Sequence, residues 1–151
     1  MRGFWLLVHF LGFTLWLGGG IATMVAGISA KGFAPAERLA VYRVIGRIQR
    51  LLVGPGAIGV VVGGIALSMP YMRSGAMPEW LVLMTVAGLL AALLAVGLSV
   101  PTAARLARLE LDPRGDLPES FAGLRKRQVV VASIAGGLGL VAMFAATILR
   151  W

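Results

Sequence analysis

The sequence has no cysteine, a single histidine and few charged residues. The absence of cysteine excludes disulfides, thiolate nucleophiles, iron–sulfur clusters and thiolate zinc sites. About a quarter of the residues in a soluble globular domain are charged, whereas 13% of this chain are charged and 59% are hydrophobic. Because so few charges cannot cover a water-facing surface, the composition indicates a membrane protein.

The residue patterns of common enzyme sites are also missing. The sequence has no glycine-rich phosphate loop, no nucleophile beside a base and no pair of acids inside an apolar segment. Its formal charge of +8 does not indicate nucleic-acid binding, because the basic residues gather at the ends of apolar segments, as they do in membrane proteins. We therefore expect a protein that is not an enzyme, that does not bind nucleic acid and that lies in a lipid bilayer.

Four apolar segments cover residues of about 3–28, 51–69, 80–100 and 129–149, and none has a charged residue in its middle. At about 1.5 Å per residue, each is long enough to cross the hydrocarbon core of a bilayer. A backbone in lipid must satisfy its own hydrogen bonds, so these segments are expected to be helices. The predicted fold class is all-α, an antiparallel bundle of four transmembrane helices, with residues 1–151 as one transmembrane domain.

The loops predict the orientation of the bundle. Residues 29–50 and 101–128 carry most of the lysine and arginine, whereas residues 70–79 carry one arginine. Lysine and arginine accumulate on the cytoplasmic side, so the first and third loops are predicted to be cytoplasmic and both termini to lie outside. Pro35 and Pro118 are typical of a first helical turn, and we expect helices two to four to extend beyond the membrane on the cytoplasmic side.

Glycine is abundant, with 21 residues, and most of them lie inside the apolar segments. Gly59 and Gly63 form a GxxxG pattern, which lets helix backbones approach closely. Two interpretations are open: packing within the bundle, or packing against a second copy or a larger membrane complex. The run Gly54-Pro55-Gly56 predicts a kink or a local opening in the second helix.

A faint internal repeat precedes two of the segments. Arg47-Ile48-Gln49 leads into the second segment, and Lys126-Arg127-Gln128 leads into the fourth. Two related hairpins would explain this recurrence, and so would the general tendency of basic residues to lie at membrane boundaries.

His9 lies about two turns into the first helix, and polar residues at that depth face the interior of the bundle. It could ligate a metal ion, ligate haem, or gain and lose a proton near neutral pH. It could also be a packing residue that is hydrogen-bonded to a neighbouring helix.

Methionines gather on the same side of the predicted membrane as His9. Met69, Met72 and Met77 surround the second loop, and Met84 lies about one turn into the third helix. Thioether sulfur suits Cu(I), so His9, Met69, Met72 and Met77 form the predicted metal site, while apolar filling is the alternative role of methionine. Copper is the first candidate cofactor. A b-type haem, bound by His9 and a methionine or by the His9 residues of a dimer, is the second.

Three arginines share one face of the second helix. Arg43, Arg47 and Arg50 follow the spacing of neighbouring turns. They are candidates for contact with an anionic ligand or with anionic lipid headgroups.

The stretch from Val8 to Gly19 resembles the opening of the CopD-like membrane proteins, which include the copper-resistance D proteins. In both, a histidine stands about seven residues before a Trp-x-Gly-Gly motif, here His9 and Trp16-Leu17-Gly18-Gly19. The resemblance is sharp over about twelve residues and topological over the rest. It implies a protein of the bacterial inner membrane.

Three functions are expected from these observations. The first is a CopD-like membrane protein involved in copper handling, as the resemblance implies. The second is an accessory or structural subunit of a membrane complex, which would pack through its glycine-rich faces. The third is an electron-transfer protein that binds b-type haem.

Overall fold

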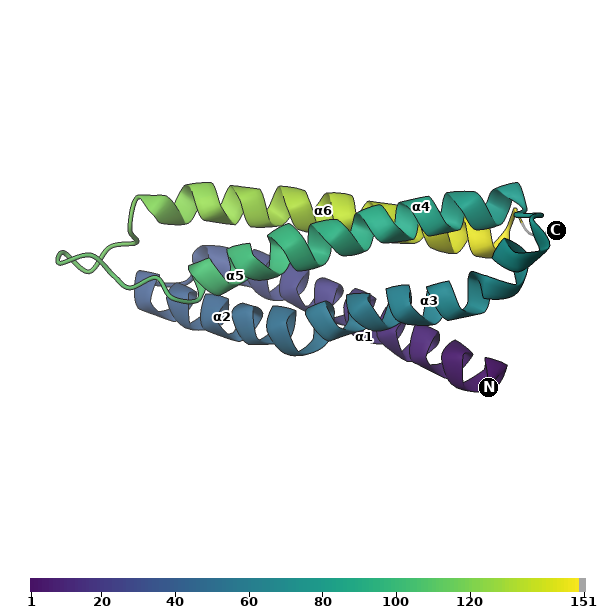
Figure 1. Cartoon of the computed structure of the whole chain (residues 1–151). Helices are drawn as coiled ribbons and strands as arrows, with labels where there is room; N and C mark the ends of the chain where they lie inside the picture. The colour runs from purple at the N-terminus through teal and green to yellow at the C-terminus, as the bar shows by residue number, and fades with distance from the viewer. Residues whose placement is uncertain (150–151) are drawn as a thin grey trace.

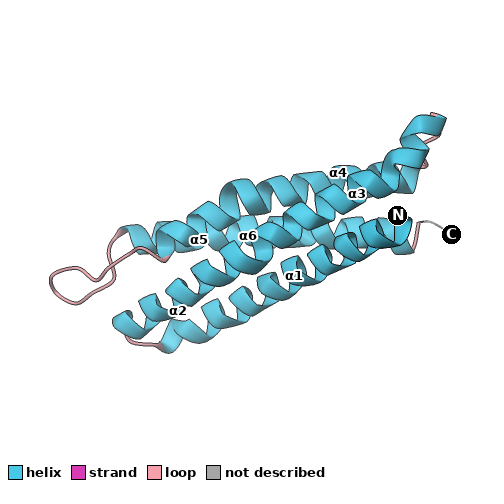
Figure 2. Ribbon diagram, turned by 60° about the horizontal axis from the view of Figure 1, so that its bottom comes forward, coloured by secondary structure: helices cyan, strands magenta, loops and turns pink. Residues whose placement is uncertain are grey.

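The computed structural model describes residues 1–149, and residues 150 and 151 lie outside the described part. Within that range the chain is helical and has no strand. Four long helices lie side by side in an elongated bundle (Figures 1 and 2). Each is long and apolar enough to cross a membrane, and the predicted all-α class is confirmed.

Nine helical elements build these four long helices, because two of the four contain a π-helical turn and one ends in a 3-10 turn. In chain order the elements are α1 (Arg2–Ser29), η1 (Ala30–Gly32), α2 (Pro35–Ile48), η2 (Gln49–Val53), α3 (Gly54–Ser74), α4 (Glu79–Leu94), η3 (Ala95–Ser99), α5 (Val100–Leu106) and α6 (Ser120–Thr147). Elements α2, η2 and α3 form the second long helix, and α4, η3 and α5 form the third.

The two ends of the bundle differ in charge. We call the end that holds the α1–α2 turn and the α5–α6 loop the basic end, because most of the lysine and arginine lies in these two connections and in the helical turns of α2, η2, α5 and α6 next to them. The start of α1, the end of α6 and the α3–α4 turn lie at the opposite end, which we call the terminal end (Figure 1). The first and third loops therefore share one end.

The second long helix begins at Pro35 and extends well past the length needed to cross a bilayer. Proline has no N–H to lose at a first helical position, and the Glu37 carboxylate accepts a hydrogen bond from the Ala34 backbone N–H at 3.2 Å. The helix runs over 40 residues, or about 60 Å at 1.5 Å per residue. Its first part projects from the apolar region toward the basic end.

Glycines set the contact between α1 and α3, the most extensive packing in the bundle. A Cβ atom added at Gly12 would lie 2.7 Å from the Gly56 carbonyl oxygen, and one added at Gly56 would lie 2.7 Å from the Gly12 carbonyl oxygen. A Cβ on Gly63 would lie 2.9 Å from the Cβ of His9. The Gly59–Gly63 pattern therefore lies against α1 within the chain, and at Gly12, Gly56 and Gly63 only glycine fits this approach of the two backbones.

The two π-helical turns, η2 and η3, contact each other where the second and third long helices cross. Pro55 is the second residue after η2, and Pro101 is the second residue after η3. A proline lacks the N–H that the carbonyl four residues earlier would bond in an α-helix. The disturbance predicted at Gly54-Pro55-Gly56 takes the form of a widened turn inside a continuous helix, a feature that often marks functional positions.

A buried chain of polar side chains connects the four long helices beside these turns. Gln128 Nε2 donates to Ser99 Oγ at 2.8 Å, and Ser99 Oγ donates to Gln49 Oε1 at 3.3 Å. Gln49 Nε2 donates to Thr23 Oγ1 at 3.3 Å. Buried amides and hydroxyls are costly without partners. This polar chain takes one residue from each long helix, and it therefore favours one rotation of each helix relative to the others.

The glycine contact predicts a selective loss of stability on adding one methyl group. Gly56→Ala should lower the free energy of unfolding by about 1–3 kcal/mol, because the new Cβ meets backbone atoms that cannot rotate away. Gly137→Ala is the matched control, since nothing lies within 4 Å of its added Cβ. The free energy can be measured by titrating a denaturing detergent into mixed micelles. Equal stability of the two variants would contradict the close contact.

Candidate functional site

A cavity of about 740 Å³ lies in the terminal half of the bundle. All four long helices contribute to its wall, which is mostly apolar. Trp16 and Gly139 line its deep part, while Arg2, Tyr71 and Trp80 line it near the terminal end. A ligand in this cavity would lie among apolar side chains with one cation near the opening.

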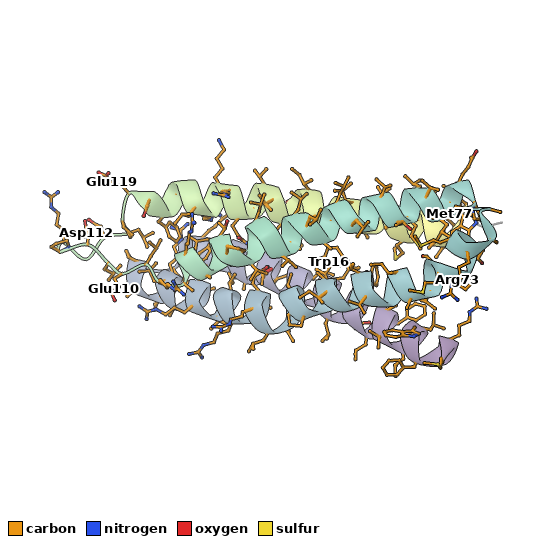
Figure 3. All side chains as sticks on the ribbon, in the orientation of Figure 1. Trp16, Arg73, Met77, Glu110, Asp112 and Glu119 are labelled. Atoms are coloured by element: carbon orange, nitrogen blue, oxygen red, sulfur yellow. The ribbon has the colours of Figure 1, made fainter. Side chains whose placement is uncertain are left out.

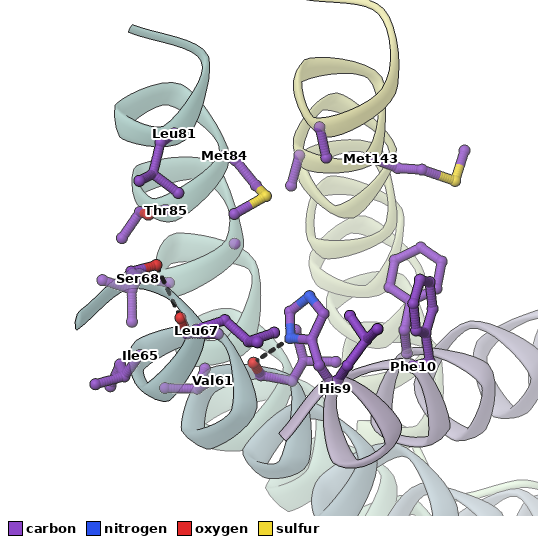
Figure 4. A pocket seen from close by; sticks show the side chains of 18 of the residues that line it. His9, Phe10, Val61, Ile65, Leu67, Ser68, Leu81, Met84, Thr85 and Met143 are labelled. Carbon is purple, nitrogen blue, oxygen red and sulfur yellow. Dashed lines mark hydrogen bonds between the residues drawn. The ribbon is translucent and has the colours of Figure 1, made fainter. Parts of the chain in front are cut away.

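His9 lines this cavity and is half-buried. Its Nδ1 atom lies 2.8 Å from the backbone carbonyl oxygen of Val60. A carbonyl oxygen can only accept a hydrogen bond, so Nδ1 must carry the proton in this contact. The neutral ring then has a bare lone pair on Nε2. Figure 4 shows this second nitrogen directed into the cavity, away from the dashed hydrogen bond.

Two neighbouring glycines of α3 position the histidine. A Cβ on Gly63 would meet the backbone nitrogen of His9 at 2.9 Å, and a Cβ on Gly64 would lie 3.4 Å from its ring Cε1 atom. The α1 backbone can therefore come close enough to α3 for the imidazole to reach Val60. This confirms the expectation that His9 faces the interior of the bundle.

Met84 is one of the two methionines that line the cavity together with His9, the other being Met143. It lines the cavity from α4, and Figure 4 shows its sulfur pointing into the cavity on the side that His9 faces. Met143 of α6 also lines the cavity, but its sulfur points away from His9 in this view. An imidazole nitrogen and one thioether therefore share the space.

The structure does not bring Met69, Met72 and Met77 to His9. They are 47%, 59% and 38% exposed, and none lines the cavity. Ser68 and Tyr71 do line it, so the residue that follows each of them is turned by about 100° to the outside of α3. Met77 lies in the turn between α3 and α4 (Figure 3). The predicted four-residue copper site is therefore not assembled.

Carboxylates do not gather at the cavity. Among residues 1–149, no group of three or more His, Asp or Glu side chains could hold a metal ion. A metal held here would depend on His9 and on thioether sulfur.

The predicted arginine face is exposed. Arg43, Arg47 and Arg50 all project from the second long helix without lining a described cavity. Sequence reasoning missed the burial of Gln49 and Gln128, although the faint repeat placed both glutamines at matching positions. That recurrence was the available signal of their shared role.

Comparison with known proteins gives no relative from which a function could be transferred. No protein-family model matches the chain, and no curated protein and no solved structure matches it. Function therefore has to be inferred from the cavity and its side chains.

The glycine beside His9 predicts a change in the protonated ring nitrogen on substitution. His9 is the only histidine, so NMR of untagged, nitrogen-labelled protein in micelles reports its ring alone. We expect the proton on Nδ1 in the wild type and a mixture of tautomers in Gly63→Ala, because the added Cβ displaces α1 and breaks the bond to Val60.

Gly59→Ala is the control for this experiment. Its added Cβ would lie 3.4 Å from the Gly12 Cα atom, an ordinary contact, so the wild-type spectrum should persist. A wild-type ring protonated on Nε2 would contradict the assigned hydrogen bond.

Proposed function

We propose that this chain is a non-enzymatic membrane protein of the CopD-like kind that binds b-type haem, with His9 Nε2 as a ligand of the iron. The observation that carries the proposal is a single imidazole, with one nitrogen bonded to Val60, facing an apolar cavity of about 740 Å³. Cofactor sites occupy about 300–1,000 Å³, and a lone metal ion needs only a small part of that space.

The residues around the cavity fit this cofactor. Metal-binding histidines usually donate their other ring N–H to a carbonyl or carboxylate, as His9 does to Val60. Histidine and methionine together ligate haem iron in some cytochromes, and Met84 supplies the thioether. The apolar wall suits a macrocycle, and Arg2 near the opening suits its carboxylates. When bound, haem would supply one-electron transfer.

A cuprous ion is the second candidate ligand. The observation that favours it is the shared cavity of His9 and Met84, because imidazole and thioether are both ligands of Cu(I). This ligand set replaces the one that included Met69, Met72 and Met77.

We further propose that the protein lies in the inner membrane of a bacterium with both termini outside. The haem cavity would then lie in the outer half of the bilayer. The support is the shared position of the first and third loops at the basic end, since lysine and arginine accumulate on the cytoplasmic side.

Cofactor content of the purified protein tests the proposal. Haem and Cu(I) are supplied in separate experiments. The wild type should take up one haem and show a Soret band. His9→Ala should lose that band because the iron loses its nitrogen ligand, and Met84→Leu should shift it. Met72→Leu is the matched control, since Met72 is exposed and lies outside the cavity.

Three results would change the proposal. Haem uptake that is equal in His9→Ala would contradict His9 as the ligand of the iron. Copper that binds to the wild type but not to His9→Ala, without haem uptake, would favour the second candidate. A protein that binds neither haem nor Cu(I) would contradict both candidates. An accessory subunit would then be favoured, packed through open glycines such as Gly18, Gly20 and Gly137.

A further inference from the structure

A second cavity, of about 590 Å³, lies at the basic end between α2 and the start of α6. Three cationic side chains line it, Arg38, Arg125 and Lys126, together with one acid, Glu119. No ion pair within residues 1–149 joins these cations to a carboxylate. The cavity therefore has an excess of positive charge that the described chain does not neutralise.

Two of the three cations are held in place by aromatic residues. The Arg38 guanidinium carbon lies 5.3 Å from the centre of the Phe121 ring. Arg125 Nε donates a hydrogen bond to the Tyr42 hydroxyl oxygen at 3.0 Å. Guanidinium groups that are already positioned lose little freedom when they bind an oxyanion. The site is therefore organised before any ligand arrives.

One donor in this site has no partner in the described chain. Arg38 Nε is buried and makes no hydrogen bond. A buried donor without an acceptor costs free energy, and arginine commonly satisfies several donors at once on a phosphate group. Because Nε itself is covered by protein, a ligand would meet the terminal N–H groups of the guanidinium. The uncompensated positive charge of the cavity indicates an anion, and two arginines suit one with several oxygen atoms.

The same cavity continues onto an apolar surface. Val129 and Val130 line it and are 54% and 48% exposed. They stand on α6 one helical turn after Arg125 and Lys126, where the predicted fourth apolar segment begins. Phosphate-binding groups and membrane-facing apolar groups are therefore adjacent, an arrangement that matches a lipid headgroup and its acyl chains.

We propose that this cavity binds the phosphate group of an anionic glycerophospholipid, whose acyl chains lie along α6. The lipid connects α2 to α6 at the basic end, where the two helices come from distant parts of the chain. It differs from the contact predicted for Arg43, Arg47 and Arg50, which are exposed and surround no cavity. The site is independent of the haem cavity.

Two adjacent residues provide a matched test. Lys126 and Arg127 are both exposed cations, but only Lys126 lines the cavity. The full chain in detergent micelles is titrated with phosphatidylglycerol, and bound lipid is counted by native mass spectrometry. Lys126→Gln should weaken binding about fivefold, the effect of one basic residue near a lipid phosphate. Arg127→Gln, which removes the same charge, should bind as the wild type does.

Further measurements distinguish a bound lipid from a free phosphate ion. The double variant Arg38→Gln/Arg125→Gln should lose the bound lipid, and its helix content by circular dichroism shows whether it has folded. Phosphatidylcholine, which has no net charge, should bind at least several times more weakly to the wild type. Inorganic phosphate at the same concentration should not displace phosphatidylglycerol.

Three outcomes would overturn the proposal. Equal weakening by Lys126→Gln and Arg127→Gln would mean that general charge attraction accounts for the binding. Equal affinity for the two lipids would remove the requirement for an anion. Displacement by inorganic phosphate would make the free ion the ligand, with no contribution from acyl chains.

Discussion

The close approach of α1 and α3 is the contact on which the rest of the structure depends. It requires glycine at positions 12, 56 and 63, because a Cβ there would overlap atoms of the opposing helix. Helix association in lipid depends on such packing, since lipid chains are as apolar as the side chains that they would replace. The contact sets how deeply α1 lies against α3, and it thereby brings His9 within hydrogen-bond distance of Val60.

The two halves of the bundle are built by different interactions. In the half nearer the basic end, the four helices are joined by hydrogen bonds through Thr23, Gln49, Ser99 and Gln128. In the terminal half they surround the large cavity around His9. Polar side chains are expensive in an apolar bundle and stabilise it only when they are paired. Each of these four side chains makes at least one such bond, although Gln128 Oε1 accepts none. This half can therefore hold the helices together while the other half keeps space for a ligand.

The elements of the fold could be predicted because they follow from local features. The length of the apolar segments is sufficient to predict the four helices. The basic residues before the second segment, together with Pro35, predict that the second helix extends beyond the apolar region. The inward direction of His9 also followed from its polarity in an apolar helix. The composition of the site could not be predicted in the same way. Whether Met72 or Met84 meets His9 depends on the rotation of α3 and α4 about their axes, which is fixed by packing between helices.

The cationic cavity at the basic end could not be predicted either, because its residues are far apart in the sequence and are brought together only by packing between helices. Arg38 and Arg125 belong to different helices, and nothing in their local sequence indicates that they share a cavity. The exposed Arg43, Arg47 and Arg50 form a clearer pattern along one helix, yet a regular spacing along a helix shows only that residues share a face. A cavity needs side chains from a second helix, and only the three-dimensional structure shows that this helix is α6.

The distance between the His9 ring and the Val60 carbonyl carbon tests the central claim most directly. Solid-state NMR of the protein in bilayers can measure it, with labelled histidine ring nitrogens and labelled valine carbonyl carbons. Val60→Ile removes the label at that position and keeps the carbonyl, so the difference between the two spectra belongs to Val60. The account predicts a separation of about 4 Å from Nδ1, given the 2.8 Å contact to the oxygen and the length of a carbonyl bond. A signal that is the same in both proteins would show that His9 is not held by α3, and it would contradict the account.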